Sequence, residues 1–183
     1  VQNECSEGWI SAESVAVCRN RAEWLMAAFP IHPLVVTGDM VWLEASAVYP
    51  GTSAYRLRMG TVLELCVEEG IPEIKETIET NRKKGTGAVI ATTEAQAEQR
   101  VQNRLSWNNY IVWLPCRAPD GSFFRQKGLI PMSRDVSVGY LSLTNEEIIK
   151  QAFKCLGDRY GWGGMLESRD CSSYIREVYR CFG

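Results

Sequence analysis

Short apolar runs with a period of two dominate the middle of the chain. LVVTGDMVWLE, AYRLRMGT, VLELCVE and YIVWLP are rich in β-branched and aromatic residues, and glycine, proline, aspartate and serine separate them. In AYRLRMGT, alternation predicts that Tyr55, Leu57 and Met59 are buried and that the two arginines between them are exposed. The pattern predicts a small antiparallel β-barrel whose strands each have one buried face.

A polar stretch interrupts this strand region at about residues 70–106. Its second part, TTEAQAEQRVQNRL, has apolar residues at helical spacing and predicts a helix. We interpret the stretch as an insertion between strands. Further along, Asp120-Gly121 is a strong signal for a hairpin turn, and Pro131 is expected to close the strand region.

The start of the chain predicts a strand fragment followed by a helix. Gly8-Trp9-Ile10 has the composition of a short strand, and Asn20 is placed to cap a helix over residues 21–28, before Pro30. The first ten residues, VQNECSEGWI, lack a basic region followed by an apolar core, so they do not predict a signal peptide.

Two helices are predicted at the other end of the chain. Thr144 and Glu147 have the spacing of a capping box, and the first helix is expected over residues 145–156. The second helix is expected to begin near Asp170, because apolar residues then recur at spacings of four, three and four, starting from Cys171. Cys171 would therefore lie in the first turn of a helix.

Charge and hydropathy exclude several classes of partner. The 20 lysines and arginines nearly balance the 22 aspartates and glutamates, so no positive excess is available to neutralise many phosphates, and we expect no nucleic-acid partner. No apolar stretch approaches the length of a membrane-spanning helix, and we expect no membrane span. The composition, with 45% hydrophobic and 23% charged residues, is that of a globular protein.

The seven cysteines do not have the close, paired spacing of a zinc site or a small disulfide scaffold. We interpret most of them as small buried hydrophobic residues. A secreted fold with one or two disulfides is the alternative, although an odd count would leave one thiol unpaired. We expect no cofactor and no metal ion.

Cys171 is the cysteine whose surroundings suggest chemistry. A thiol attacks as the thiolate, and the first turn of a helix favours that anion through its free N–H groups. Asp170 precedes Cys171, and a carboxylate that pointed at a thiol would disfavour the anion, so a substrate-binding role suits Asp170 better. The preceding loop has glycines that would let a ligand approach the backbone: Gly161, Gly163 and Gly164.

The segment GDRYGWGGMLESRDCSSYIREVYRCFG resembles the signature of NlpC/P60 cysteine peptidases. In that family a Tyr-x-Trp-Gly-Gly loop precedes an Asp-Cys-Ser triplet that opens the catalytic helix. The resemblance implies that Cys171 is the nucleophile and that Asp170, Ser172 and Tyr160 line the substrate site; core packing is the alternative for Tyr160. Ser173 departs from the family pattern, in which glycine is more usual, and we expect little effect from it.

The upstream strand pattern resembles the bacterial SH3-like modules that precede such catalytic domains. The implied fold class is α+β, with a bacterial SH3-like β-barrel followed by the N-terminal helices of a papain-like NlpC/P60 domain. Residues 1–34 would be the end of a first SH3-like module with a linker helix, residues 35–142 the barrel, and residues 143–183 the start of the catalytic domain. Both ends are expected to be internal to a longer protein, so the remaining part of the catalytic domain is one expected partner.

The resemblance implies a cysteine peptidase that hydrolyses the stem peptides of bacterial peptidoglycan, at a γ-D-glutamyl to diamino-acid bond. It would act in the cell envelope or outside the cell, or in cytoplasmic wall recycling. Such chemistry needs an imidazole base, and the single histidine, His32, lies between prolines far upstream, where we interpret it as a loop residue. The full-length protein is therefore expected to be active and these residues alone inactive. The alternative is a non-catalytic cell-wall-binding or structural module with an incomplete peptidase domain.

Overall fold

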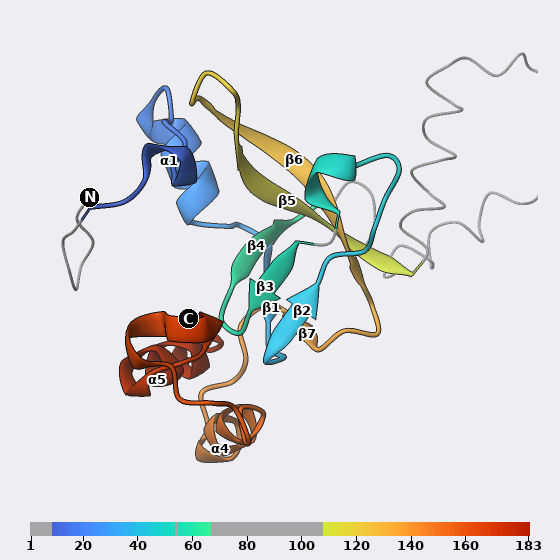
Figure 1. Ribbon diagram of the computed structural model, residues 1–183. Helices are drawn as coiled ribbons and strands as arrows, with labels where there is room; N and C mark the ends of the chain where they lie inside the picture. The colour runs from blue at the N-terminus through green and yellow to red at the C-terminus, as the bar shows by residue number, and fades with distance from the viewer. Residues whose placement is uncertain (1–8, 54, 67–107) are drawn as a thin grey trace, which may run out of the picture.

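The computed structural model describes residues 9–53, 55–66 and 108–183 (Figure 1). These residues combine helices with β-sheet, which confirms the α+β class. The insertion predicted at about 70–106 lies outside the described residues. The strand predicted at the start is wrong for Trp9 and Ile10, which belong to no strand and have exposed side chains.

An antiparallel five-stranded sheet forms the centre of the molecule, in the order β6-β5-β4-β1-β7 (Figure 1). Its strands are β1 (Pro33–Val36), β4 (Val62–Leu65), β5 (Asn109–Arg117), β6 (Phe123–Pro131) and β7 (Val136–Val138). A separate two-stranded sheet pairs β2 (Met40–Trp42) with β3 (Arg56–Arg58).

The described strands form an open sheet, and the closed SH3-like barrel expected from the sequence is not shown. Closure would require the edge strands β6 and β7 to be joined through hydrogen bonds. The β2–β3 pair instead contributes Val41 and Leu57 to the main core without joining the ladder of the larger sheet. The two sheets are therefore held together by side-chain packing, whereas the sequence predicts one barrel with continuous hydrogen bonding between strands.

Two local strand predictions also differ from the structure. β6 ends at Pro131 as expected, but β7 follows it and pairs with β1, with Leu34 opposite Val138. A three-residue strand is too short to show a periodicity of its own. Tyr55 is 63% exposed because it precedes the first residue of β3, whereas Leu57 and Met59 are buried as predicted.

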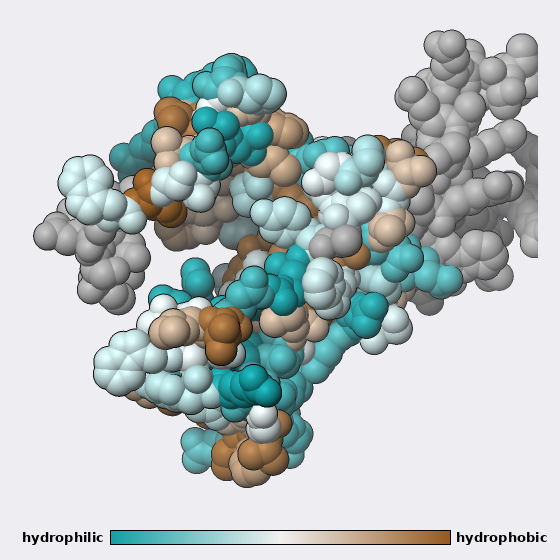
Figure 2. Space-filling model, viewed as in Figure 1, coloured by the Kyte–Doolittle hydropathy of each residue, from teal (hydrophilic) through white to brown (hydrophobic). Residues whose placement is uncertain are grey.

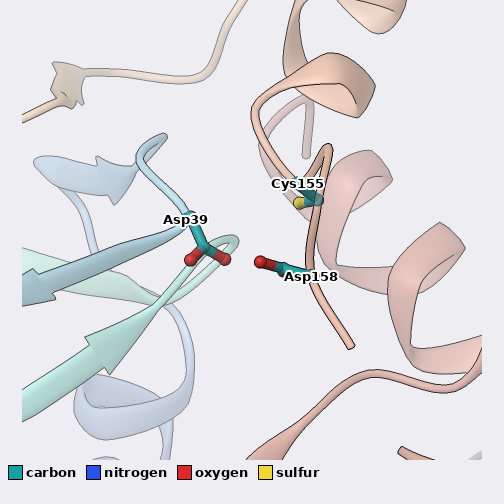
Figure 3. Close-up of side chains that lie close together, drawn as sticks. All are labelled: Asp39, Cys155 and Asp158. Atoms are coloured by element: carbon teal, nitrogen blue, oxygen red, sulfur yellow. The ribbon is translucent and has the colours of Figure 1, made fainter. Parts of the chain in front are cut away.

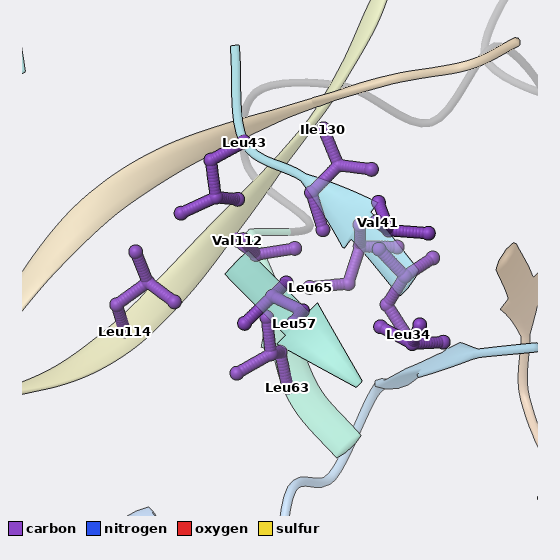
Figure 4. Close-up of a cluster of buried hydrophobic side chains, with 10 residues drawn as sticks. Leu34, Val41, Leu43, Leu57, Leu63, Leu65, Val112, Leu114 and Ile130 are labelled. Carbon is purple, nitrogen blue, oxygen red and sulfur yellow. The ribbon is translucent and has the colours of Figure 1, made fainter. Parts of the chain in front are cut away.

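The main hydrophobic core lies between the two sheets (Figure 4). It gathers buried aliphatic side chains from β1 to β6: Leu34, Val36, Val41, Leu43, Leu57, Leu63, Leu65, Val112, Leu114 and Ile130. The alternation in VLEL places Leu63 and Leu65 in this core and leaves Glu64 half-buried. The pattern read from the sequence thus identifies the inner face of β4.

β1 is buried on both faces, which alternation alone did not predict. Leu34 and Val36 point into the main core, and Val35 between them belongs to a second cluster with Cys155, Val178 and Cys181. These three side chains of β1 have no exposed surface, because the main core covers one face of the strand and helical residues cover the other.

The α-helices in the described part of the chain begin at caps that the sequence predicts. In α1 (Arg21–Ala28) the side chain of Asn20 accepts a hydrogen bond from the N–H of Glu23 at 2.9 Å. In α4 (Asn145–Phe153) the hydroxyl of Thr144 accepts from the N–H of Glu147 at 3.2 Å. α4 ends three residues before the predicted residue 156, and α5 (Cys171–Arg180) begins where predicted. The described residues also contain the short 3-10 segments η1 (Ala12–Ser14), η2 (Pro50–Thr52) and η6 (Trp162–Glu167).

The hairpin predicted at Asp120-Gly121 is confirmed between β5 and β6. Gly121 has a φ of 87°, and the carboxylate of Asp120 accepts hydrogen bonds from the N–H and the hydroxyl of Ser122 at 2.9 and 2.7 Å. These bonds lower the pKa of Asp120. Because the turn fixes the register, nine consecutive pairs join β5 to β6.

The turn between β3 and β4 contacts α5 directly. Gly60 has a φ of +74°, and a Cβ placed there would lie 2.6 Å from the carbonyl oxygen of Glu177. Glycine is therefore required both by the backbone conformation and by the space. This close approach seats α5 against the sheet (Figure 1).

Part of the helical region is apolar and exposed (Figure 2). Ile149 and Phe153 on α4 are 56% and 65% exposed, and Ile175 on α5 is 54% exposed. Both of these helices therefore carry exposed apolar side chains. No described helix has the length and apolar character needed to cross a membrane.

Candidate active site

Cys171 is the first residue of α5, and the cap of this helix is a complete capping box. The carboxylate of Asp170 accepts from the N–H of Ser173 at 2.7 Å, and the hydroxyl of Ser173 accepts from the N–H of Asp170 at 2.9 Å. The hydroxyl of Ser172 also donates to Asp170 at 2.9 Å. Ser173 was expected to have little effect, yet it makes a hydrogen bond that glycine could not make. The box holds Cys171 at the N-terminus of the helix.

The Asp170 carboxylate is turned toward the helix cap. Hydrogen bonds lower the pKa of Asp170 to about 2. The largest contribution comes from the N–H of Ser173, followed by the hydroxyls of Ser173 and Ser172. The carboxylate is thus ionised throughout the neutral range. The substrate-binding roles expected for Asp170 and Ser172 stay predictions, because the structure shows these groups bonded within the cap.

The cap predicts a specific dependence of stability on acid. Because the folded pKa of Asp170 is about 2 and the unfolded value is about 3.9, Asp170 contributes its full stabilisation above about pH 4 and loses it as the pH falls toward 2. An asparagine at this position cannot titrate but still caps a helix. We expect the Asp170→Asn variant to lose less melting temperature than the wild-type chain between pH 4 and pH 2, as followed by circular dichroism. Equal losses in the two proteins would contradict this assignment.

The thiol of Cys171 is exposed and lies at an open hollow of about 250 Å³. The hydroxyl of Tyr160 donates to the Cys171 Sγ at 4.0 Å, and this contact is the main cause of a raised pKa of Tyr160. Tyr160 is 62% exposed, so the core-packing alternative for it is wrong. The hollow is completed by Cys155, Asp158, Arg159, Arg169, Asp170 and Tyr174.

A backbone pairing brings Tyr160 to the thiol. Tyr160 and Arg169 form a parallel bridge, and the N–H of Gly161 donates to the Arg169 carbonyl at 2.8 Å. The chain between them turns back through Gly163 and Gly164, which both have positive φ. Both glycines therefore serve the shape of the loop, since positive φ is a conformation that favours glycine. Trp162, the residue before them, is 77% exposed.

Arg169 and its partners are the feature that the sequence analysis missed. The Arg169 side chain is only 6% exposed, its Nε donates to Glu177 Oε2 at 2.7 Å, and its Nη1 contacts the carboxylates of Asp39 and Asp158. Burial opposes the charge, but the bonds to Glu177 and Asp39 outweigh it and raise the pKa of Arg169. Arg58 Nε lies 3.4 Å from the other oxygen of Glu177. Asp39 and Arg169 are 130 residues apart, so no local pattern in the sequence indicates that they pair.

Asp39, Cys155 and Asp158 could together offer three ligand atoms to a metal ion. These atoms lie within 4.8 Å of one another, and Figure 3 shows the two carboxylates facing each other across the gap between the sheet and the helices. The Nη1 of Arg169 contacts both carboxylates, so a cation of the chain itself already compensates their charge. This donor set therefore does not favour a metal site.

The single histidine lies elsewhere. His32 precedes β1, and its Nδ1 is 3.1 Å from Glu64 Oε1. Its side chain lines a different hollow, next to α1, together with Leu25 and Phe29. The sequence interpretation of His32 as a loop residue is confirmed, and no imidazole lines the hollow that contains Cys171.

The six described cysteines are all free thiols, so the disulfide alternative is wrong for them; Cys5 lies outside the described residues. Cys155 and Cys181 are buried as expected, and desolvation raises the pKa of both thiols.

The described site therefore offers an exposed thiol at a helix N-terminus, a phenol beside it and a buried ion network behind it, with no general base of the histidine type. Such a thiol can act as a nucleophile. Proton transfer to a leaving amine would need a further group. A scan against protein-family models and a search of curated proteins found no match to this chain.

Proposed function

We propose that Cys171 is the nucleophile of a cysteine peptidase of the NlpC/P60 kind. The observation that carries this proposal is the exposure of Cys171 at the first position of α5, in an open hollow with the Tyr160 hydroxyl beside its sulfur. The free N–H groups of a first helical turn favour negative charge on the thiol and on an attacked carbonyl oxygen. Cys155 and Cys181 have no comparable access to solvent.

The reaction also requires an imidazole to accept the thiol proton and return it to the leaving amine. His32 is paired with Glu64 and does not line the hollow of Cys171. In this proposal the imidazole comes from the remaining part of the catalytic domain, outside these 183 residues. The exposed apolar side chains of α4 and α5 would suit the packing of that part (Figure 2).

The proposed substrate is a stem peptide of bacterial peptidoglycan, cleaved between γ-D-glutamate and a diamino acid, in the cell envelope or outside the cell. The support is the order of features along the chain, with a strand-rich module before the Tyr-x-Trp-Gly-Gly and Asp-Cys-Ser motifs. We further propose that the strand-rich module is related to bacterial SH3-like domains. Its short antiparallel strands around one core support this relation.

One observation favours a second candidate, a non-catalytic cell-wall-binding module. The only histidine in the chain lies away from the thiol. In that case Cys171 would be a remnant of a peptidase site, and the hollow would bind a peptide without cleaving it.

A substrate-shaped electrophile tests the proposal without requiring turnover. We expect a chloromethyl ketone built on L-Ala-γ-D-Glu to alkylate Cys171 about tenfold faster than its α-L-Glu isomer, which corresponds to about 1.4 kcal/mol of recognition. The site of alkylation is read by peptide mass spectrometry, with Cys171→Ala as the blank. Equal rates for the two isomers would contradict the proposed substrate.

Hydrolysis of L-Ala-γ-D-Glu-diaminopimelate then separates the two candidates. The 183-residue chain is expected to show no turnover above its Cys171→Ala variant, because no imidazole lines the hollow. The full-length gene product is expected to cleave the peptide and to lose this activity in the Cys171→Ala form. Selective alkylation without cleavage by the full-length product would support the binding module instead.

A further inference from the structure

Arg169 contacts two parts of the candidate site through its main chain. It directly precedes Asp170 and Cys171, so its backbone leads into the cap of α5. It also forms the parallel bridge with Tyr160, and its carbonyl accepts the 2.8 Å hydrogen bond from Gly161. The position of the Arg169 backbone therefore sets the position of the Tyr160 hydroxyl relative to Cys171.

The side chain of Arg169 ties this backbone to three separate segments. Asp39 lies in the turn between β1 and β2, Asp158 follows α4, and Glu177 lies on α5. The Arg169 Nη2 also donates to the backbone carbonyl of Asp39 at 3.0 Å. Because a guanidinium is a planar fork, acceptors on several sides fix its orientation as well as its position. Asp39 thus links the sheet to the segment that contains Tyr160.

We propose that Arg169 is a positioning residue, through which Asp39 of the β1–β2 turn holds the Tyr160 hydroxyl against the Cys171 sulfur. The significance of this arrangement for catalysis rests on the proposed function. It implies that the β1–β2 turn contributes to the site, since removing the Asp39 carboxylate would change the surroundings of the thiol although Asp39 does not contact it.

The contact between Tyr160 and Cys171 gives a direct readout of this positioning. In the wild-type chain, Tyr160→Phe is expected to slow iodoacetamide alkylation of Cys171 at pH 7 by about threefold, because it removes one donor to the sulfur. In an Asp39→Asn background, where the hydroxyl is no longer held in place, the same change is expected to alter the rate by less than about 1.5-fold. Alkylation is quantified on the Cys171 peptide by mass spectrometry.

Asp135→Asn is the matched control. Asp135 also connects the sheet to the helical region, through Lys154 at 2.7 Å and Thr37 at 2.7 Å, but the structure places it in a different ion pair from Arg169. In this background Tyr160→Phe should keep its threefold effect. Loss of the effect in both backgrounds would assign it to general packing and overturn the proposal.

Arg169→Lys provides a second variant, which keeps the positive charge and removes the planar guanidinium group. It should reduce the Tyr160→Phe effect in the same way as Asp39→Asn, with circular dichroism confirming that the chain is folded at the assay temperature. An undiminished threefold effect in Asp39→Asn and Arg169→Lys would overturn the proposal, as would the absence of any Tyr160→Phe effect in the wild-type chain. Because alkylation needs no substrate, these results are independent of whether the protein cleaves a stem peptide.

Discussion

Under native conditions, iodoacetamide is expected to alkylate Cys171 at least about 100-fold faster than Cys181. Cys171 is exposed, whereas Cys181 has no exposed surface and its sulfur lies 3.4 Å from the amide nitrogen of Gln151. Burial also raises the pKa of the Cys181 thiol and so reduces its reactive anion. Reaction at Cys181 must then wait for an opening of the second hydrophobic cluster. Peptide mass spectrometry over a time course measures the rate at each thiol.

The other cysteines calibrate this experiment. Cys155, which is 8% exposed and has a raised pKa, should react slowly like Cys181. Cys18 and Cys116 are partly exposed and should react at intermediate rates. In concentrated urea the differences in alkylation rate should disappear, because unfolding exposes every thiol to solvent. Comparable native rates at Cys171 and Cys181 would show that the packing of α5 described above is wrong.

Replacing Arg169 with methionine is expected to lower the free energy of unfolding by about 3–5 kcal/mol. The substitution removes the cation that Glu177, Asp39 and Asp158 share, and Glu177 keeps only the longer 3.4 Å contact with Arg58. The Glu177 side chain is itself only 8% exposed, so its charge suffers most from the loss. Because domains of this size are stable by only about 5–15 kcal/mol, the variant should unfold at a much lower urea concentration.

Arg159→Met is the control for this measurement. Arg159 lines the same hollow but is exposed, so its replacement should change the free energy of unfolding by less than about 0.5 kcal/mol. Arg169→Lys keeps the charge without the planar fork and should fall between the wild-type chain and Arg169→Met. A loss below about 1 kcal/mol for Arg169→Met would mean that the carboxylates find other partners.

Arg169 and Cys171 are two residues apart, yet the sequence indicated the role of only one of them. The cap around Cys171 depends on Asp170 and Ser173, which lie within the same turn, so local spacing was enough to place the thiol at a helix start. The partners of Arg169 come from β1–β2, from the loop after α4 and from α5. The sequence contains many carboxylates that could pair with an arginine, and only the folded structure shows which of them lie next to Arg169.

The same distinction applies to the rest of the chain. The sequence by itself determined the helix starts at Asn20, Thr144 and Asp170 and the hairpin at Asp120, because hydrogen bonds within a few residues fix them. It also determined the inner face of β4, because apolar and polar residues alternate along this strand. Only the tertiary structure decided that the sheet stays open and that β1 is buried on both faces. Both depend on which side chains pack across long separations, where the energy of a contact depends on the whole arrangement and leaves no period in the sequence.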